Sequence, residues 1–241
     1  MPPDPNDERT GGMSTTPTNA GTQGSGTGSA RRAAVGNQPN SERGRRTRRQ
    51  LLVAARKIFE RDGFLDARVT DIASAAGASH GSFYTYFESK TDIFRTLCSE
   101  ELDVLYANTG SGEPAGEATD PVERIDRSNR RFVEIYKENA ALLGLFEQVT
   151  AYDDEVRKLR LAVRERAVAR VQHSIGQMQE AGLVDPDLEP FHAASALVTM
   201  VNGTVHFWLV LGEEFDEETL VRTLTQLWVR ALGLGRHGQQ G

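Results

Sequence analysis

Residues 79–90 read SHGSFYTYFESK and bring together side chains that could contact another molecule. Four of the five positions 83–87 are aromatic, although aromatics make up only 7% of the chain: Phe83, Tyr84, Tyr86 and Phe87. A helix that only supports a core needs a single apolar stripe. Aromatic groups spread around most of a short helix therefore indicate a contact in addition to the core.

At 100° per residue, this short helix divides into an inward and an outward face. Phe83 and Phe87 are four residues apart and are expected in the core. The other side is small and polar, which suits a helix whose first residues meet base edges in the major groove of DNA. This outward set is His80, Gly81, Ser82, Tyr84 and Thr85.

A basic run, RGRRTRR, precedes this segment. Residues 43–68 hold nine Lys and Arg against three acids, whereas residues 108–241 hold fourteen against twenty-one, in a chain of net charge −6. Basic side chains confined to one region of an acidic chain are typical of a site that neutralises phosphates. The alternative, a merely solvated tail, stays open from charge alone. The predicted phosphate or minor-groove contacts are Arg45, Arg46, Arg48 and Arg49.

Histidines and carboxylates raise the alternative of an enzyme. His192 and His206 are 14 residues apart on one predicted helix, about 21 Å along its axis, which is too far to share a metal or a proton. The sequence contains no Gly-rich phosphate loop, nucleophile elbow or Cys/His cluster. We therefore expect no enzymatic activity, no metal site and no cofactor. A second alternative, a helical protein-interaction module without specific DNA binding, would need neither the arginine run nor the outward face.

The elements that position these residues are predicted to be helices throughout. Apolar residues recur at spacings of three and four from Arg45 onward, and this helix should end at Gly63, which can adopt a positive φ. A short helix capped by Thr70 follows. Gly77 is expected to make the next turn and Ser79 to cap the recognition helix, which completes a helix-turn-helix.

Composition divides the chain into three parts. Residues 1–40 contain almost nothing apolar and are expected to form a disordered tail. Residues 41–89 form the predicted helix-turn-helix DNA-binding domain. Residues 90–235 form the predicted ligand-binding and dimerisation domain, in which the Gly- and Pro-containing segment 108–120 is expected to be a loop.

No membrane contact or secretion is expected. The single cysteine, Cys98, cannot form an intramolecular disulfide, and the N-terminus lacks a signal-peptide pattern. The most apolar stretch, residues 193–211, is interrupted by polar residues and is a poor bilayer span. The sequence therefore favours a cytoplasmic protein.

A close resemblance to the DNA-binding region of TetR-type transcriptional regulators is carried by VTDIASAAGASHGSFYTYFESKTDIF and the preceding helix RRQLLVAARKIFERDGF. The match covers residues 46–97. It implies a homodimer whose two recognition helices enter adjacent major grooves, and a small-molecule effector that loosens DNA binding. By position it implies a base or thymine-methyl contact for Tyr84, a phosphate contact for Tyr86, and a helix start against the DNA backbone for Lys90.

The resemblance does not transfer an operator sequence. Ser82 stands where the family commonly has threonine, and His80 and Thr85 occupy variable positions. The complete predicted DNA-binding set is Arg45, Arg46, Arg48, Arg49, Thr70, Ser79, His80, Gly81, Ser82, Tyr84, Thr85, Tyr86 and Lys90.

The C-terminal region is predicted to hold helices at 121–150, with a break near Asn139, and at 152–180. Aromatic side chains on several helices suggest a mostly apolar cavity, although each alone is more often ordinary core. Such a cavity favours a lipophilic or aromatic effector with one or two hydrogen-bonding groups. Its predicted lining is Phe132, Tyr136, Phe146, Val149, His173, Asn202 and Trp208.

Two further predicted helices, residues 190–211 and 216–232, are candidates for a dimer interface. The first is apolar nearly all round, and such a helix must be covered on all sides. A second copy of the chain is the expected cover, in a four-helix bundle across a two-fold axis. The predicted interface is Val198, Val201, Val205, Leu220, Leu224, Leu227 and Ala231.

The sequence therefore predicts an all-α, ligand-responsive, DNA-binding transcriptional regulator. Family expectation adds a repressor that binds a palindromic operator as a dimer and is released by a small effector. The predicted cavity lining makes that effector lipophilic. The residues do not identify the effector, the operator sequence or the regulated genes.

Overall fold

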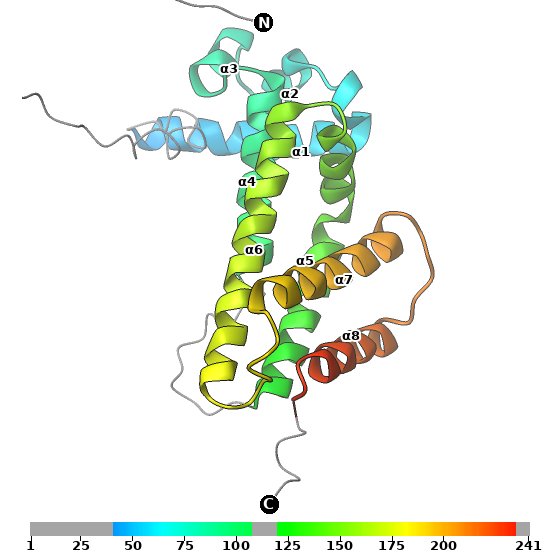
Figure 1. Cartoon of the computed structure of the whole chain (residues 1–241). Coiled ribbons are helices and arrows are strands. Elements are labelled where there is room, and N and C mark those ends of the chain that lie inside the picture. Colours follow the sequence, from blue (N-terminus) through cyan, green and yellow to red (C-terminus); the bar gives the residue numbers. More distant parts are fainter. Residues whose placement is uncertain (1–40, 108–119, 235–241) are drawn as a thin grey trace, which may run out of the picture. The chain divides into compact units, whose positions relative to one another are not determined.

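The computed structural model describes residues 41–107 and 120–234, and all regular structure in these residues is helical (Figure 1). This confirms the all-α prediction. The predicted tail at 1–40 and nearly all of the predicted loop at 108–120 lie outside the described residues. The helices described are α1 (Glu42–Asp66), α2 (Val69–Ala75), α3 (His80–Tyr86), α4 (Lys90–Ala107), α5 (Pro121–Thr150), α6 (Asp154–Glu180), α7 (Pro190–Leu209) and α8 (Glu217–Ala231).

Helix α1 is interrupted near its C-terminal end by a glycine. Gly63 has φ 74° and ψ 172°, so the positive φ predicted for this position is confirmed. The sequence had predicted the end of the helix at Gly63, but one more helical turn follows up to Asp66. Phe64 in this turn packs its ring against Phe94 of α4, with centroids 4.9 Å apart.

The turn between α2 and α3 has the geometry predicted for it. Gly77 takes φ 67°, and the Ser79 hydroxyl accepts a hydrogen bond from the Ser82 N–H at 3.1 Å, which caps α3. The predicted cap of α2 is wrong. Arg68 occupies the cap position without a side-chain hydrogen bond, and Thr70 lies inside the helix with its side chain exposed.

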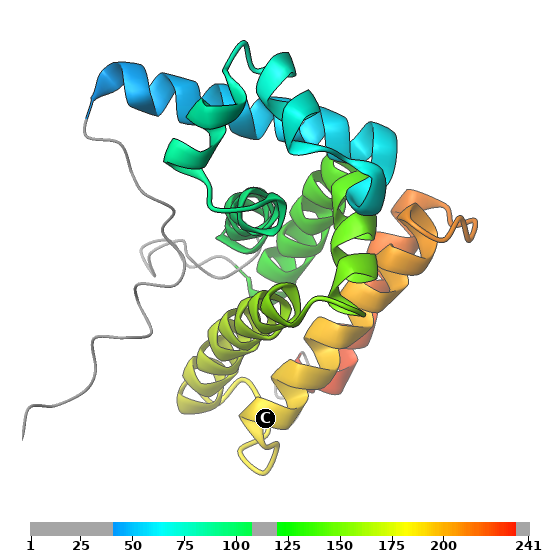
Figure 2. The same ribbon diagram turned by 90° about the horizontal axis from the view of Figure 1, so that it is seen from above.

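Helix α4 connects the helix-turn-helix to the rest of the chain. The Ser89 hydroxyl accepts from the Asp92 N–H at 3.0 Å, and the Asp92 carboxylate accepts from the Glu88 N–H at 3.0 Å, an arrangement similar to a capping box. The helix packs against α1, α5 and α6 and is seen end-on in Figure 2. One apolar core runs from α1 to α8 through these contacts. The domain boundary between residues 89 and 90 stays a prediction.

Helix α5 is continuous over 30 residues, so the break predicted near Asn139 is wrong. The Asn139 amide donates to the Ile135 carbonyl at 2.8 Å, and its oxygen accepts from Arg56 of α1 at 2.9 Å. Gly144 also lies within the helix. A Cβ at this position would stand 2.9 Å from Cγ1 of Val210, so the glycine permits a close approach to the end of α7.

Helices α6, α7 and α8 complete the C-terminal region. Helix α7 packs along α6, and α8 packs along α5. The turn predicted at 181–190 separates α6 from α7, and Gly182 in this turn has φ 70°. None of the described helices is both long and apolar enough to cross a membrane.

Candidate functional site

The outer face of α3 is presented as the spacing predicted. Phe83 and Phe87 are 0% and 1% exposed and fix the helix to the core, whereas Tyr84 is 51% exposed. The His80 ring lies edge-on to Tyr84, with centroids 5.1 Å apart. Gly81 is exposed as well. A histidine and a tyrosine at the start of an anchored short helix can contact base edges in a groove.

The other predicted contacts of this region lie around α3. Thr85 is exposed and Ser82 is half-buried beside the cap that Ser79 provides. Tyr86 is half-buried and packs against the core. Its phosphate contact, like the DNA contacts of the residues around it, stays a prediction.

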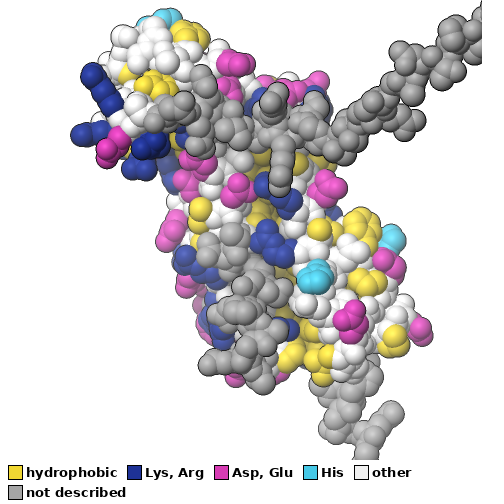
Figure 3. Space-filling model, turned by 90° about the vertical axis from the view of Figure 1, so that its left-hand side faces the viewer, with side chains coloured by type: hydrophobic (Ala, Val, Ile, Leu, Met, Phe, Trp, Pro, Cys, Tyr) yellow, Lys and Arg dark blue, Asp and Glu magenta, His cyan; other side chains and the backbone are white. Residues whose placement is uncertain are grey.

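The arginines at the start of α1 have two different environments. Arg45, Arg46 and Arg49 are exposed, and in Figure 3 Lys and Arg side chains gather at the upper end of the molecule, which carries α1 and α3. Arg48 instead turns inward. Its side chain is 15% exposed, donates to Glu100 of α4 at 3.1 Å and lies 5.4 Å from the centroid of the Phe87 ring. This contact argues against the phosphate contact expected of Arg48.

Lys90 corrects a second expectation. Its ammonium donates to the carbonyl oxygens of Phe64, Leu65 and Ala67 at 2.7, 2.9 and 3.0 Å. An ammonium has three N–H donors, so none is left for a phosphate. Burial lowers the pKa of Lys90, although the nearby Asp66 carboxylate opposes that effect. The side chain fastens the end of α1 to the start of α4.

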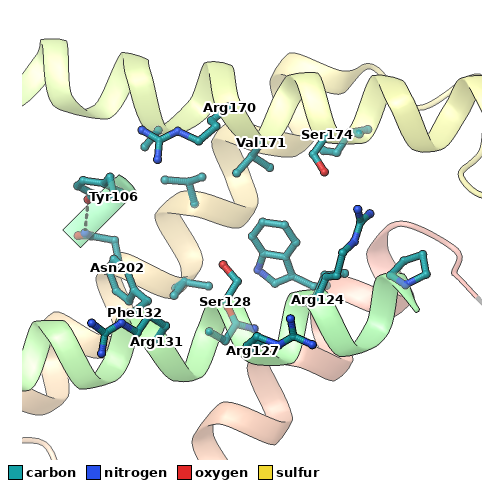
Figure 4. A pocket seen from close by; sticks show the side chains of 18 of the residues that line it. Tyr106, Arg124, Arg127, Ser128, Arg131, Phe132, Arg170, Val171, Ser174 and Asn202 are labelled. Carbon is teal, nitrogen blue, oxygen red and sulfur yellow. Dashed lines mark hydrogen bonds between the residues drawn. The ribbon is translucent and has the colours of Figure 1, made fainter. Parts of the chain in front are cut away.

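A cavity of about 310 Å³ lies in the C-terminal region (Figure 4). Tyr106 reaches it from α4, and Trp228 reaches it from α8. Arg170 and Ser174 on α6 lie across the cavity from Ser128 on α5. The apolar part of the wall includes Phe132, Ala167, Val171, Ile175, Met178, Val198 and Val201.

Only part of the predicted ligand lining belongs to this cavity. Phe132 and Asn202 line it. Phe146 and Val149 are 1% and 0% exposed and belong to the core instead. His173 is exposed on the surface of α6.

Tyr136 and Trp208 also lie outside the lining of the cavity. The Tyr136 hydroxyl is 3.1 Å from Nδ1 of His206, and the Trp208 ring lies 5.8 Å from the Lys137 ammonium. The tryptophan at the cavity is Trp228.

Four arginines of the cavity were missed: Arg124, Arg127, Arg131 and Arg170. The first three recur at spacings of three and four, so they share one face of α5, and this signal was present in the sequence. The predicted lining included only His173 and Asn202 as polar residues, because charged residues on an amphipathic helix are expected to face solvent.

Tyr106 and Asn202 separate the cavity from a smaller one. The Asn202 amide donates to the Tyr106 hydroxyl at 3.0 Å, and burial raises the pKa of that tyrosine. Both residues also line a second cavity of about 200 Å³, together with Glu147 and Arg160, which form an ion pair at 2.6 Å. Among residues 41–107 and 120–234, no group of three His, Cys, Asp or Glu side chains is arranged to hold a metal.

The predicted dimer interface is largely buried within one chain. Four of its residues are at most 6% exposed and cannot meet a partner: Val201, Val205, Leu220 and Leu224. Val198 is half-buried at the cavity. Leu227 is 43% exposed and Ala231 is exposed, so both are available to a partner. Phe207 and Leu211, 53% and 60% exposed, were missed.

Comparison with known proteins agrees with this arrangement. Residues 51–97 match the family model described as "Bacterial regulatory proteins, tetR family". The HTH-type transcriptional repressor DhaR of Mycobacterium sp. (strain GP1) is 28% identical over 179 residues, 74% of this chain and 88% of DhaR. The regulator EthR of Mycobacterium tuberculosis (strain H37Rv) is 25% identical over 211 residues, 83% of this chain and 96% of EthR.

A solved structure shares the fold. The transcriptional regulator FadR from Bacillus subtilis, crystallised in complex with stearoyl-CoA, superposes with a TM-score of 0.64 at 19% identity. The match covers 76% of this chain and 98% of FadR.

Proposed function

Because this chain belongs to the TetR family and is a ligand-responsive DNA-binding regulator, we propose that it acts as a homodimeric repressor in the cytoplasm. The dimer binds a palindromic operator and blocks transcription. A small molecule that fills the cavity between α5 and α6 releases the operator. Repression is supported by DhaR, which is a repressor and covers most of this chain.

The observation that carries the proposal is the outward face of α3 on a rigid support. Tyr84 and His80 face solvent, while the buried Phe83 and the Ser79 cap hold the helix in one orientation. Base contacts need such fixed geometry, because hydrogen bonds to base edges are lost with small displacements. The exposed arginines of α1 supply the sequence-independent attraction to phosphate.

A dimer is supported by apolar side chains that the chain leaves uncovered on its last two helices. Phe207 of α7, Leu211 beyond the end of α7, and Leu227 of α8 are each more than 40% exposed. Gly203 on α7 has open space around its missing Cβ, which suits close contact with another helix. A two-fold axis beside α7 and α8 would cover these groups with the same groups of a second copy.

Helix α4 provides the route from the cavity to the DNA. Its 18 residues extend about 27 Å, from Lys90 at the helix-turn-helix to Tyr106 at the cavity wall. Glu100 and Glu101 in between bind Arg48 and Arg56 of α1 at 3.1 Å each. A ligand that shifts Tyr106 therefore moves α4 and α1 together. The coupling needs only about 1 to 3 kcal/mol.

The proposal is tested by fluorescence anisotropy with operator DNA selected from random duplexes. Tyr84→Ala should weaken operator binding by about 1 to 3 kcal/mol and relax sequence preference. Phe191→Ala is the control, because Phe191 is an aromatic residue that is 49% exposed but lies at the start of α7. Equal operator affinity of both variants and the wild type would exclude the proposed role of α3. If the wild-type protein binds the selected operator no more tightly than random duplex, a protein-interaction module without specific DNA binding is favoured instead.

A further inference from the structure

We propose that the cavity binds an amphipathic anion, a molecule with an apolar body and one acidic headgroup, and that the positive charges of Arg124 and Arg170 attract the headgroup. The inference rests on the proposed function, and it gives the chemical class of the effector. It makes more specific the lipophilic or aromatic effector with one or two hydrogen-bonding groups that the sequence suggested.

The charge of the cavity wall carries the first step. Four arginines line the cavity, and no Asp or Glu is among the described residues that do so. The whole chain has a net charge of −6, so this is a local reversal of sign. Arg127 and Arg131 are exposed at the rim, and Arg131 is engaged with Glu134 at 3.1 Å. Arg124 and Arg170 are half-buried on opposite helices and face the interior (Figure 4).

Unsatisfied donors carry the second step. Among the described residues, three buried side-chain nitrogens lack a hydrogen-bond partner: Nε of Arg48, Nε of Arg124 and Nε1 of Trp228. Two of these three belong to residues that line the cavity. A buried donor without an acceptor is unfavourable by about 1 to 3 kcal/mol. An acceptor oxygen at the cavity wall would offer either donor a partner once its side chain turns toward the ligand, whereas a cationic ligand would offer none.

The apolar wall carries the third step. Phe132, Ile175 and Met178 are each at most 5% exposed and border the cavity. A volume of about 310 Å³ is near the lower end for ligand pockets, which span about 300 to 1,000 Å³. Inorganic phosphate would leave this wall unfilled, and a sugar would place hydroxyls against it. An alkyl chain or ring would cover the apolar wall, and one carboxylate or phosphate attached to it would complement the charge of the arginines.

The first experiment varies the headgroup on a constant chain. Trp208→Phe leaves Trp228 as the single tryptophan, since the chain has two. Dodecanoate, dodecyl phosphate, dodecanol and dodecyltrimethylammonium are titrated below their micelle concentrations, and Trp228 emission and operator anisotropy are followed together. Both anions should bind at least tenfold more tightly than the alcohol, and the ammonium should bind most weakly. The tighter anion distinguishes a carboxylate from a phosphate headgroup.

The second experiment removes the positive charges. Arg124→Met and Arg170→Met should each weaken dodecanoate binding at least tenfold and leave dodecanol binding within twofold. Arg170→Lys, which keeps the charge, should retain most of the preference for the anion. Arg157→Met is the matched control on α6, because Arg157 pairs with Asp154 and does not line the cavity. It should bind every probe as the parent does.

The outcomes separate this inference from the proposed function. Equal affinity for anion, alcohol and ammonium would overturn the inference, and so would unchanged dodecanoate binding in both Met variants. Absence of any emission change would overturn it too, while operator binding by the free protein would leave the DNA-binding role intact. Dodecanoate that binds in the cavity without releasing the operator would support the anion site and contradict the proposed ligand response.

Discussion

Arginines serve the two ends of α4 in different ways. Near the helix-turn-helix, Arg45, Arg46 and Arg49 are exposed on one short stretch of α1. At the other end, Arg124 and Arg170 are half-buried at two different places in the wall of one hollow. Exposed cations can meet a long polyanion and are screened by salt. Partly buried cations around a cavity suit one small anion, so exposure rather than residue type decides the partner.

Side-chain exposure also decides the role of two leucines on α8. Leu224 is 2% exposed and Leu227 is 43% exposed, three positions further along the helix. Leu224→Arg should bury an unpaired charge and reduce the free energy of unfolding by at least about 4 kcal/mol. Leu227→Arg should keep the fold and produce a monomer that binds the operator poorly.

Circular dichroism during thermal unfolding and sedimentation velocity measure these two effects. Leu161→Arg is the control, because Leu161 is 60% exposed on α6, away from the proposed interface. It should remain folded and dimeric. A Leu227→Arg protein that is still dimeric at micromolar concentration would rule out the proposed interface.

Lys90 contrasts with the exposed arginines as a cation that supports the fold. Lys90→Met removes the donor from three carbonyl oxygens and should lower the free energy of unfolding by about 3 kcal/mol. Lys137→Met is the control, since Lys137 forms a surface pair with Glu217 that is worth about 1 kcal/mol or less. Urea unfolding compares them, and equal losses would contradict the structural role of Lys90.

The helix-turn-helix was largely predictable because short-range rules decide it. Gly77 has no Cβ and so takes its positive φ without strain, and the Ser79 cap lies three residues from its donor. The structural role of Lys90 could not be predicted from such short-range rules. Its carbonyl partners lie 23 to 26 positions earlier in the chain, so only the folded contact reveals them.

The cavity was predicted poorly because its wall depends on which helix faces meet. Phe146 and Phe132 are both aromatic residues on α5, yet one is enclosed by the core and the other borders the hollow. Nothing in their local spacing distinguishes them. Trp208 was predicted in place of Trp228 for the same reason, since the faces that α7 and α8 turn toward α5 decide which indole reaches the cavity.

Substitution of the exposed arginines of α1 tests whether they contact DNA phosphates. Arg46→Ala and Arg49→Ala should each reduce the slope of log affinity against log salt by about one and weaken binding similarly for all duplexes. Arg61→Ala is the control at the far end of α1, where Arg61 pairs with Asp62. Slopes that stay unchanged in both variants would show that α1 does not contact phosphate.

The smallest expected effect comes from two helical glycines. Gly144→Ala should place a Cβ 2.9 Å from Val210 and destabilise the fold by about 1 kcal/mol. Gly176→Ala meets no atom within 4 Å and should stabilise α6 by about 0.5 to 1 kcal/mol. Urea midpoints that move in the same direction would contradict the close contact between α5 and the end of α7.

Footprinting on the DNA that flanks the chain's own coding region tests the central claim most directly. A dimer that presents two copies of α3 should protect two symmetric half-sites whose centres lie about 34 Å apart, or a multiple of that distance. Tyr84→Ala should lose this pattern, and Phe191→Ala should retain it. A protein that protects no segment above the level of random DNA, or that protects equally well with Tyr84 replaced, would contradict the account.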